Sequence, residues 1–220
     1  MRVFFFIYLL LCTACVYAQE FEIDPDQWAP GAIALIRGEK LSGLIYYHKE
    51  KQTLYFKQEE QEVRAFKASK VSKFSFYDST ENRERSFISI PFKKAASEKE
   101  RPEFLEVVRK YKTFFLLSRF STQKVTIPRN KYIPPQTINQ TIEDWYLIDE
   151  DGSRHLYFSF IHRDFFNPKV EFFNAALFKE ITGPHRNEIE AFSTSKKLNS
   201  RKPSDNLKLL DYAEELQNIN

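Results

Sequence analysis

The side chains most able to catalyse a reaction or to hold a metal are scattered along this sequence. Its 4 histidines lie far apart: His48, His155, His162 and His185. Two imidazoles that share a metal usually come from an HxH or HxxxH spacing, which none of these pairs shows. We therefore expect no metal site.

Acidic residues offer two further candidates for chemistry. Glu143 and Asp144 precede Trp145, and a pair of carboxylates can act as the acid and the base of a glycosidase. Residues 149–152, Asp-Glu-Asp-Gly, resemble the opening of a calcium loop, but the acidic ligand near the end of such a loop is missing. We favour a solvated strand edge for the first group and a hairpin turn for the second.

Motifs for nucleophilic catalysis and for nucleotide binding do not occur in the sequence. There is no GxSxG elbow, no GxGxxG loop and no GxxxxGK[ST] loop. The chain has only 5 glycines, which leaves little material for a phosphate-binding loop. We expect no cofactor and assign no catalytic residue.

Aromatic side chains are better candidates for binding. Trp28 stands just before the first expected strand, and Trp145 and Tyr146 open a late one. Exposed, these rings could stack on a sugar or a peptide; buried, they would fill the ends of the core, which we favour.

The first 18 residues are typical of a secretory signal peptide. Arg2 supplies a short positive region, and the apolar run over 3–16 is shorter than the roughly 20 residues of a spanning helix. Compact residues stand where a signal peptidase acts, and we predict cleavage between Ala18 and Gln19.

Lipidation at Cys15 is one alternative fate of this leader, because a lipoprotein signal ends in small residues followed by cysteine. Such signals usually carry leucine three residues earlier, where this chain has Cys12. An uncleaved anchor is the other alternative. We favour export to the periplasm or the extracellular space. Cleavage would remove both cysteines, so the mature chain would need no disulfide to fold.

The charge of the mature chain is nearly balanced. Loss of Arg2 would leave 32 basic and 30 acidic residues in 202, with the two signs mixed along the chain. A nucleic-acid partner would be expected to meet a concentrated basic face, so we expect none. No later run approaches 18 apolar residues, and we expect no transmembrane segment in the mature chain.

Apolar residues alternate with period two from Gly31 to about Ile161, which predicts antiparallel hairpins. The expected strands cover 33–36, 41–47, 54–56, 71–77, 87–92, 104–108, 114–119, 145–148 and 155–161. Over 124–142 we expect a long loop, because prolines at 128, 134 and 135 oppose regular pairing.

After Pro168 the period changes toward 3.6 residues, which predicts helices. The first carries Ala175 to Ile181 and ends at Gly183, the second begins at Pro184, and Ser204 caps the third. A polar connector is expected over 193–203.

These patterns predict a β-rich α+β fold, an antiparallel meander that forms a barrel or a strongly twisted sheet, followed by two or three C-terminal helices. About eight or nine strands would enclose one compact interior. The expected organisation is a signal peptide over 1–18, an antiparallel β domain over 19–165, and a helical segment over 166–220 packed on it or appended to it.

Packing and turn residues carry a resemblance to a known group of proteins. They are Trp28, Gly31 and Ile33, then Gly38, Leu41 and Gly43, then Phe66, Ala68, Val71 and Phe74, with Phe178, Ile189, Lys197, Leu198, Asp205, Leu209, Leu210 and Tyr212 in the tail. The pattern resembles an uncharacterised family of secreted proteins of Bacteroidota. The resemblance implies export, a β-rich body with a helical tail, and no established activity.

Two short sequons could carry glycans. Asn139 begins an Asn-Gln-Thr acceptor for N-glycosylation within the Pro-rich stretch. Ser79, in Asp-Ser-Thr, fits the O-glycosylation acceptor of exported Bacteroidota proteins and lies in an expected hairpin loop. Matches of three residues arise often by chance.

The sequence favours an exported, non-enzymatic binding or interaction module of the cell envelope, whose partner would be a protein or a glycan. A hydrolase that acts on envelope polysaccharide or peptide with dispersed carboxylates is the alternative.

Overall fold

The computed structural model describes residues 27–58, 61–93, 99–127, 135–162 and 168–219. The predicted leader, its cleavage site at Ala18 and Gln19, and Cys15 lie outside these residues.

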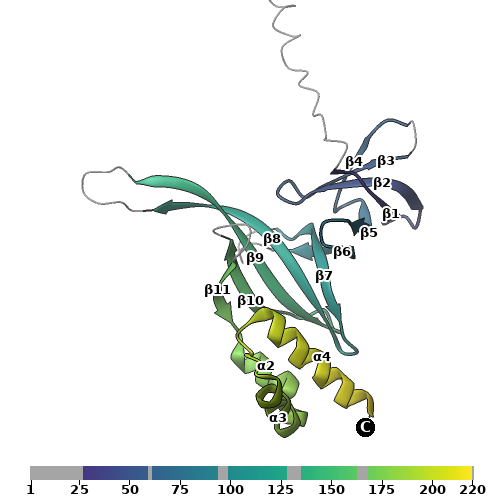
Figure 1. The fold of residues 1–220 in the computed structure, drawn as a ribbon. Coiled ribbons are helices and arrows are strands. Elements are labelled where there is room, and N and C mark those ends of the chain that lie inside the picture. The colour runs from purple at the N-terminus through teal and green to yellow at the C-terminus, as the bar shows by residue number, and fades with distance from the viewer. Residues whose placement is uncertain (1–26, 59–60, 94–98, 128–134, 163–167, 220) are drawn as a thin grey trace, which may run out of the picture.

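The described strands form one antiparallel sheet in the order β11-β10-β9-β8-β7-β6-β5-β1-β2-β3-β4 (Figure 1). Their bounds are β1 Ala29–Leu35, β2 Lys40–His48, β3 Thr53–Lys57, β4 Arg64–Lys67, β5 Val71–Asp78, β6 Arg83–Phe92, β7 Arg101–Lys110, β8 Phe114–Ile127, β9 Gln136–Asp149, β10 Arg154–His162 and β11 Pro168–Phe173. The predicted β-rich fold is confirmed, as a twisted sheet that stays open, with β4 and β11 at its edges.

The N-terminal strands curl back over the sheet. Tyr47 of β2 packs its ring 4.9 Å from Phe87 of β6 and 5.7 Å from Phe104 of β7, although β2 is not a neighbour of either strand in the sheet. Two hydrogen bonds hold this layer in place: Ser89 Oγ donates to the Ala68 carbonyl at 2.7 Å, and Phe104 N–H donates to Gln52 Oε1 at 2.7 Å. Strands β1–β4 therefore cover one end of the sheet, on the side that we call its inner face.

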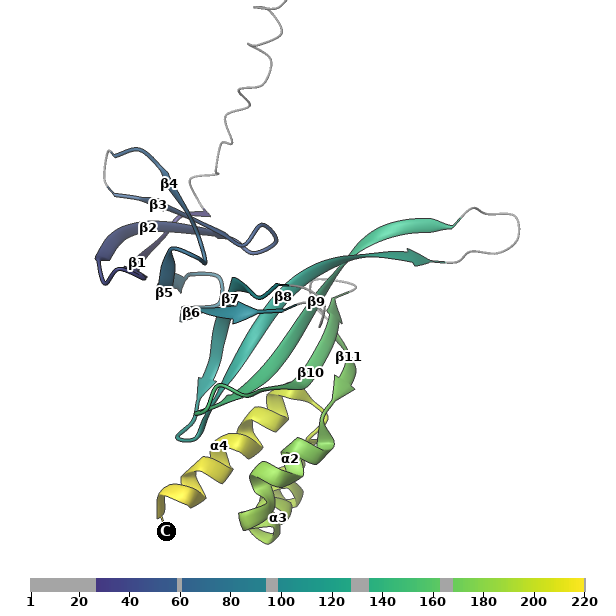
Figure 2. The same cartoon turned by 180° about the vertical axis from the view of Figure 1, so that it is seen from behind.

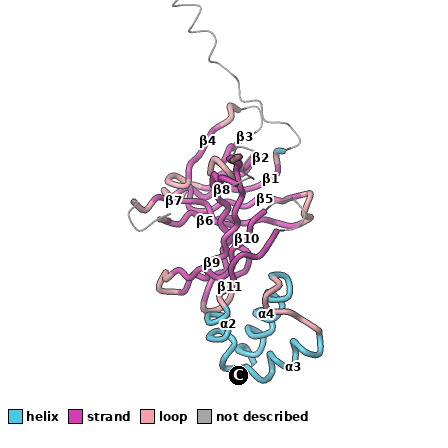
Figure 3. The backbone as a smooth tube through the Cα atoms, turned by 90° about the vertical axis from the view of Figure 1, so that its left-hand side faces the viewer, coloured by secondary structure: helices cyan, strands magenta, loops and turns pink. Residues whose placement is uncertain are grey.

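The helices cover the other end of the inner face (Figures 2 and 3). They are α2 Ala175–Thr182, the 3₁₀ turn η3 Gly183–His185, α3 Arg186–Lys196 and α4 Pro203–Ile219. Leu210 of α4 is buried against Trp145, Tyr157 and Phe158 of the sheet. A buried hydrogen bond fixes the helix, because Tyr157 Oη donates to Asn206 Oδ1 at 2.8 Å.

The inner face carries two apolar clusters, so the expected single compact interior is wrong. The first lies under the N-terminal layer: Ile33, Ile45, Leu54, Phe56, Ala68, Val71, Phe74, Phe87 and Phe104. The second lies under the helices: Tyr111, Phe114, Leu116, Trp145, Leu147, Tyr157, Phe158, Phe160 and Leu210. A smaller cluster around Leu105, Leu117 and Ile148 occupies the outer face.

Several predicted boundaries need correction. The expected loop over 124–142 is wrong for most of its described part, because β8 and β9 stay paired out to Ile127 and Gln136. Strand β4 is an addition to the expected set, and β11 forms where only helix was expected. Helix α2 ends at Thr182 before Gly183, as predicted, whereas α3 begins after the 3₁₀ turn and runs to Lys196, inside the expected connector. Within the described part of the chain, none of the helices has the length and apolar content needed to cross a membrane.

Candidate functional site

A row of cross-strand neighbours runs across the inner face; it is apolar at both ends and polar in the middle. It starts with apolar side chains of β1, β5 and β6, where Ile33 is opposite Phe74 and Phe74 is opposite Phe87. It continues through Glu106 of β7 and Ser118 of β8 and becomes apolar again at Trp145 of β9 and Phe158 of β10. The polar residues lie between the two apolar clusters, so the inner face carries a polar strip there.

A pocket of about 830 Å³ opens over this polar strip, and we call it the inner-face pocket. Strands β6 to β10 supply its floor, the β2–β3 turn contributes Lys49, and α4 contributes Leu207. The volume is in the range of small-molecule sites, about 300–1,000 Å³. The pocket thus lies where the two covering layers leave the sheet uncovered.

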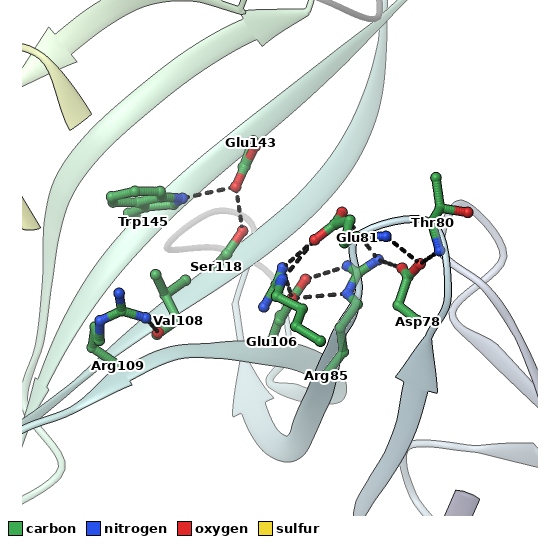
Figure 4. A network of polar contacts seen from close by, with 11 residues as sticks. Asp78, Thr80, Glu81, Arg85, Glu106, Val108, Arg109, Ser118, Glu143 and Trp145 are labelled. Atoms are coloured by element: carbon green, nitrogen blue, oxygen red, sulfur yellow. Dashed lines mark hydrogen bonds and ion pairs between the residues drawn. The ribbon is translucent and has the colours of Figure 1, made fainter. Parts of the chain in front are cut away.

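A buried ion-pair network forms one wall of the inner-face pocket (Figure 4). Arg85 and Glu106 are each only 5% exposed, and the Arg85 guanidinium donates to both carboxylate oxygens of Glu106. Arg83 Nη2 adds a third donor at 2.9 Å, and Asp78 Oδ2 accepts from Arg85 Nη1 at 3.1 Å. Burial alone would lower the pKa of Arg85, but its bonds to Glu106 raise it overall. Arg85 therefore stays charged.

A second carboxylate is held on the floor of the pocket. Glu143 Oε1 accepts from Trp145 Nε1 at 2.7 Å and from Ser118 Oγ at 2.8 Å, and Oε2 lies 3.0 Å from His162 Nε2. Burial alone would raise the pKa of Glu143, but the hydrogen bonds from His162, Trp145 and Ser118 lower it overall. Glu143 is therefore an ionised acceptor whose two oxygens are already engaged.

Lys49 reaches into the pocket from the β2–β3 turn. Its Nζ lies 4.5 Å from the centre of the Phe120 ring, a cation–π distance. The Phe120 ring is in turn 5.9 Å from the ring of His162. This contact joins the N-terminal layer to β8 at the edge of the pocket.

A second pocket of about 670 Å³ lies at the end of the sheet near α2, and it includes the candidate calcium loop. Residues 149–152 form the β9–β10 turn, in which Gly152 has a φ of +84°. His155 Nε2 lies 3.3 Å from Asp149 Oδ2. Among the residues that the structure describes, no group of three or more His, Cys, Asp or Glu side chains is placed to hold a metal ion.

The three predicted aromatic binding residues do not come together. Trp145 is 9% exposed and contributes to the inner-face pocket. Tyr146 points to the outer face, where its ring packs 5.2 Å from Phe92, and burial raises its pKa to about 12. Trp28 is partly buried, 6.3 Å from Tyr46 of β2. Only Trp145 belongs to the site.

Ser79 and Asn139, the predicted glycan acceptors, lie in different settings. Ser79 is exposed in the β5–β6 turn, as expected. Asn139 is exposed too, but it belongs to strand β9, opposite Lys124, and not to a loop. Modification of either residue stays a prediction.

The sequence did not single out six residues of this site: Lys49, Arg83, Arg85, Glu106, Ser118 and Phe120. The sequence raised His162 only as a candidate metal ligand. One signal could have found part of this set. Arg85 shares a face of β6 with Phe87, and Glu106 shares a face of β7 with Phe104. Charges at core-facing positions require partners.

Comparisons with known proteins add no assignment. No protein-family model, no curated protein and no solved structure matches the chain. The resemblance to secreted proteins of Bacteroidota stays a prediction.

Proposed function

We propose that the protein is an exported, non-enzymatic binding module of the cell envelope and that its ligand binds in the inner-face pocket. The observation that carries the proposal is the pocket of about 830 Å³ over the polar strip. Aromatic and charged side chains from five strands and two turns line it, and α4 adds Leu207. Such a mixture of apolar surface and a few placed polar groups is typical of small-molecule sites. Export rests on the leader-like N-terminus.

The carboxylates in the pocket support binding over hydrolysis. A glycosidase needs one carboxyl group that stays protonated to donate to the leaving group. Glu106 receives donors from Arg83 and Arg85, and Glu143 receives donors from Ser118, Trp145 and His162. Asp144, the other predicted carboxylate, is engaged by Ser159 Oγ at 2.6 Å. For Glu143 these donors lower the pKa, which suits an acceptor and not a proton donor.

Binding of a neutral aromatic dye tests whether the pocket accepts ligands. Val108 lies on β7 at the pocket and is partly buried. In Val108→Trp the indole would project into the pocket and occupy part of the apolar surface that the dye needs. We therefore expect the affinity for N-phenylnaphthylamine, measured from its fluorescence enhancement, to fall at least about tenfold.

The matched control is Ile36→Trp, which adds the same ring at a 58% exposed position of the β1–β2 turn outside the pocket. We expect it to bind the dye as the unmodified chain does. Equal binding by all three proteins, or no binding by any of them, would contradict the proposed site.

A further inference from the structure

In the buried part of the inner-face pocket, the carboxylate acceptors are already hydrogen-bonded within the chain. Of the carboxylates in its wall, Glu81, Glu106 and Glu143 already accept from donors of the chain. Glu50, the remaining one, is exposed to solvent. The acceptors of the buried part are therefore occupied before any ligand arrives.

The ammonium of Lys49 is a donor that the pocket leaves available. Among the described residues, Lys49 has no salt bridge and no side-chain hydrogen bond, and its Nζ lies over the face of Phe120. A cation above an aromatic ring keeps its N–H groups free to bond elsewhere. Lys49 can thus donate to an oxygen of a ligand without losing a partner.

The charge of Lys49 is also incompletely balanced by the chain. Burial lowers the pKa of Lys49, and the nearby charge of Arg85 lowers it further, against the opposing effect of Glu106, Glu81 and Glu143. A negative group placed beside the ammonium would favour its charged form. The electrostatics therefore point in the same direction as the geometry.

We propose that the inner-face pocket takes a small organic acid with an apolar body, and that Lys49 Nζ donates to its acidic oxygens. Phe120, Val108 and Leu207 supply apolar surface for the body, on three different elements around the pocket. Arg85 is bonded to both Glu106 and Asp78, so its charge is already paired within the chain. This inference rests on the proposed function of the pocket and specifies its ligand class.

Two dyes with the same aromatic body isolate the role of the acid. Anilinonaphthalene sulfonate carries an anionic group, and N-phenylnaphthylamine does not. We expect the intact protein to bind the sulfonate more tightly, and Lys49→Gln to weaken the sulfonate about 10- to 100-fold while leaving the neutral dye within about twofold, since a hydrogen bond to a charged group contributes about 1.5–3 kcal/mol.

Two further variants test whether the effect depends on the charge at position 49 or on the net charge of the protein. Lys49→Arg retains a cation and should recover most of the sulfonate affinity. Lys73→Gln removes one exposed positive charge of β5 away from the pocket and should bind both dyes as the intact protein does. Near-ultraviolet circular dichroism of each variant reports whether the fold is retained.

The two proposals fail in different ways. If neither dye binds, the proposed function is overturned, and the ligand class with it. If the neutral dye binds in the pocket but Lys49→Gln weakens both dyes equally, or neither, the role of Lys49 is wrong and the binding function stands.

Discussion

At the scale of single residues, the carboxylate of Glu143 links the candidate site to the stability of the fold. Three strands supply its hydrogen-bond partners, which are Ser118, Trp145 and His162. Hydrogen bonds to a charged group contribute more than those between neutral groups, about 1.5–3 kcal/mol. The group that gives the pocket its polar floor therefore also joins β8, β9 and β10.

The pH dependence of unfolding measures this contribution. The pKa of Glu143 in the folded chain lies below its ordinary value of 4.5, so its stabilising effect is fully present above about pH 4.5 and is lost as the pH falls through the lowered value. We expect Glu143→Gln to reduce the free energy of unfolding by about 1.5–3 kcal/mol at pH 7 and the difference from the intact chain to shrink below pH 4. Urea titrations at several pH values would measure both.

The control for this measurement is Glu150→Gln, in the exposed β9–β10 turn. It removes one carboxylate with no buried donors and should leave the pH profile of the intact chain unchanged. A Glu143→Gln profile parallel to that of the intact chain down to pH 3 would show that the carboxylate carries no pH-dependent stability.

At the scale of elements, two glycines permit the curl of the N-terminal strands. Gly31 of β1 is paired directly with Gly43 of β2. A Cβ on Gly43 would lie 2.6 Å from the Lys57 carbonyl oxygen and 2.9 Å from the Phe56 ring, and one on Gly31 would collide with the Ser75 carbonyl. The absence of side chains lets neighbouring strands approach closely at both positions, which bends the sheet over its own inner face.

Gly43→Ala should therefore destabilise the chain. The neighbouring atoms include backbone, which cannot move aside cheaply, so we expect a loss of about 1–3 kcal/mol. Gly183→Ala is the matched change, because a Cβ added there would meet no neighbouring group within 4 Å and the φ is −53°. This substitution should be neutral or stabilising by up to about 1 kcal/mol. Thermal unfolding of the two variants side by side measures the difference. Equal transition temperatures would argue against the close approach at Gly43.

The sequence predicted the elements with strong periodicity and missed those that depend on neighbours. The hairpins of β5 with β6 and of β7 with β8 follow from alternation within each strand, and the end of α2 follows from Gly183 and Pro184. Strand β4 spans only Arg64–Lys67 and exists because β3 offers it a free edge. No local pattern encodes that edge.

Prolines misled the prediction for β8 and β9. Pro135 lies just before the paired part of β9, where it removes no hydrogen bond from the ladder. The sequence did not predict the candidate site, for a related reason. Lys49 and Phe120 are far apart in sequence, and they meet only because β2 curls over β8, a tertiary event that periodicity does not describe.

At the scale of the whole molecule, the pocket is a consequence of how the sheet is covered. The N-terminal layer buries the inner face of β5–β7 and the helices bury that of β8–β10, and each cover has its own apolar cluster. The polar strip lies where these covers end. Arg85 and Glu106 are already buried in this gap, and their bonds to each other offset the desolvation cost.

The same architecture leaves one part of the sheet without cover. Residues 123–127 of β8 and 136–140 of β9 pair only with each other, beyond the last partners of β7 and β10, and form a two-stranded arm that projects from the body (Figures 1 and 2). Isolated two-stranded hairpins are marginally stable in water. The arm should therefore open far more often than the rest of the two strands.

Hydrogen exchange along β8 and β9 tests this difference within single strands. Amides of residues 114–118 and 145–148 lie in the four-strand region between β7 and β10, against buried Leu116 and Leu147. We expect the amides of the arm to exchange at least about tenfold faster than these, since local opening needs less free energy where few apolar contacts are broken. Uniform protection along both strands would contradict the expectation that the arm is marginally stable in the single chain. Repeating the exchange at a tenfold lower protein concentration would then distinguish intrinsic stability of the arm from self-association, because only the latter weakens on dilution.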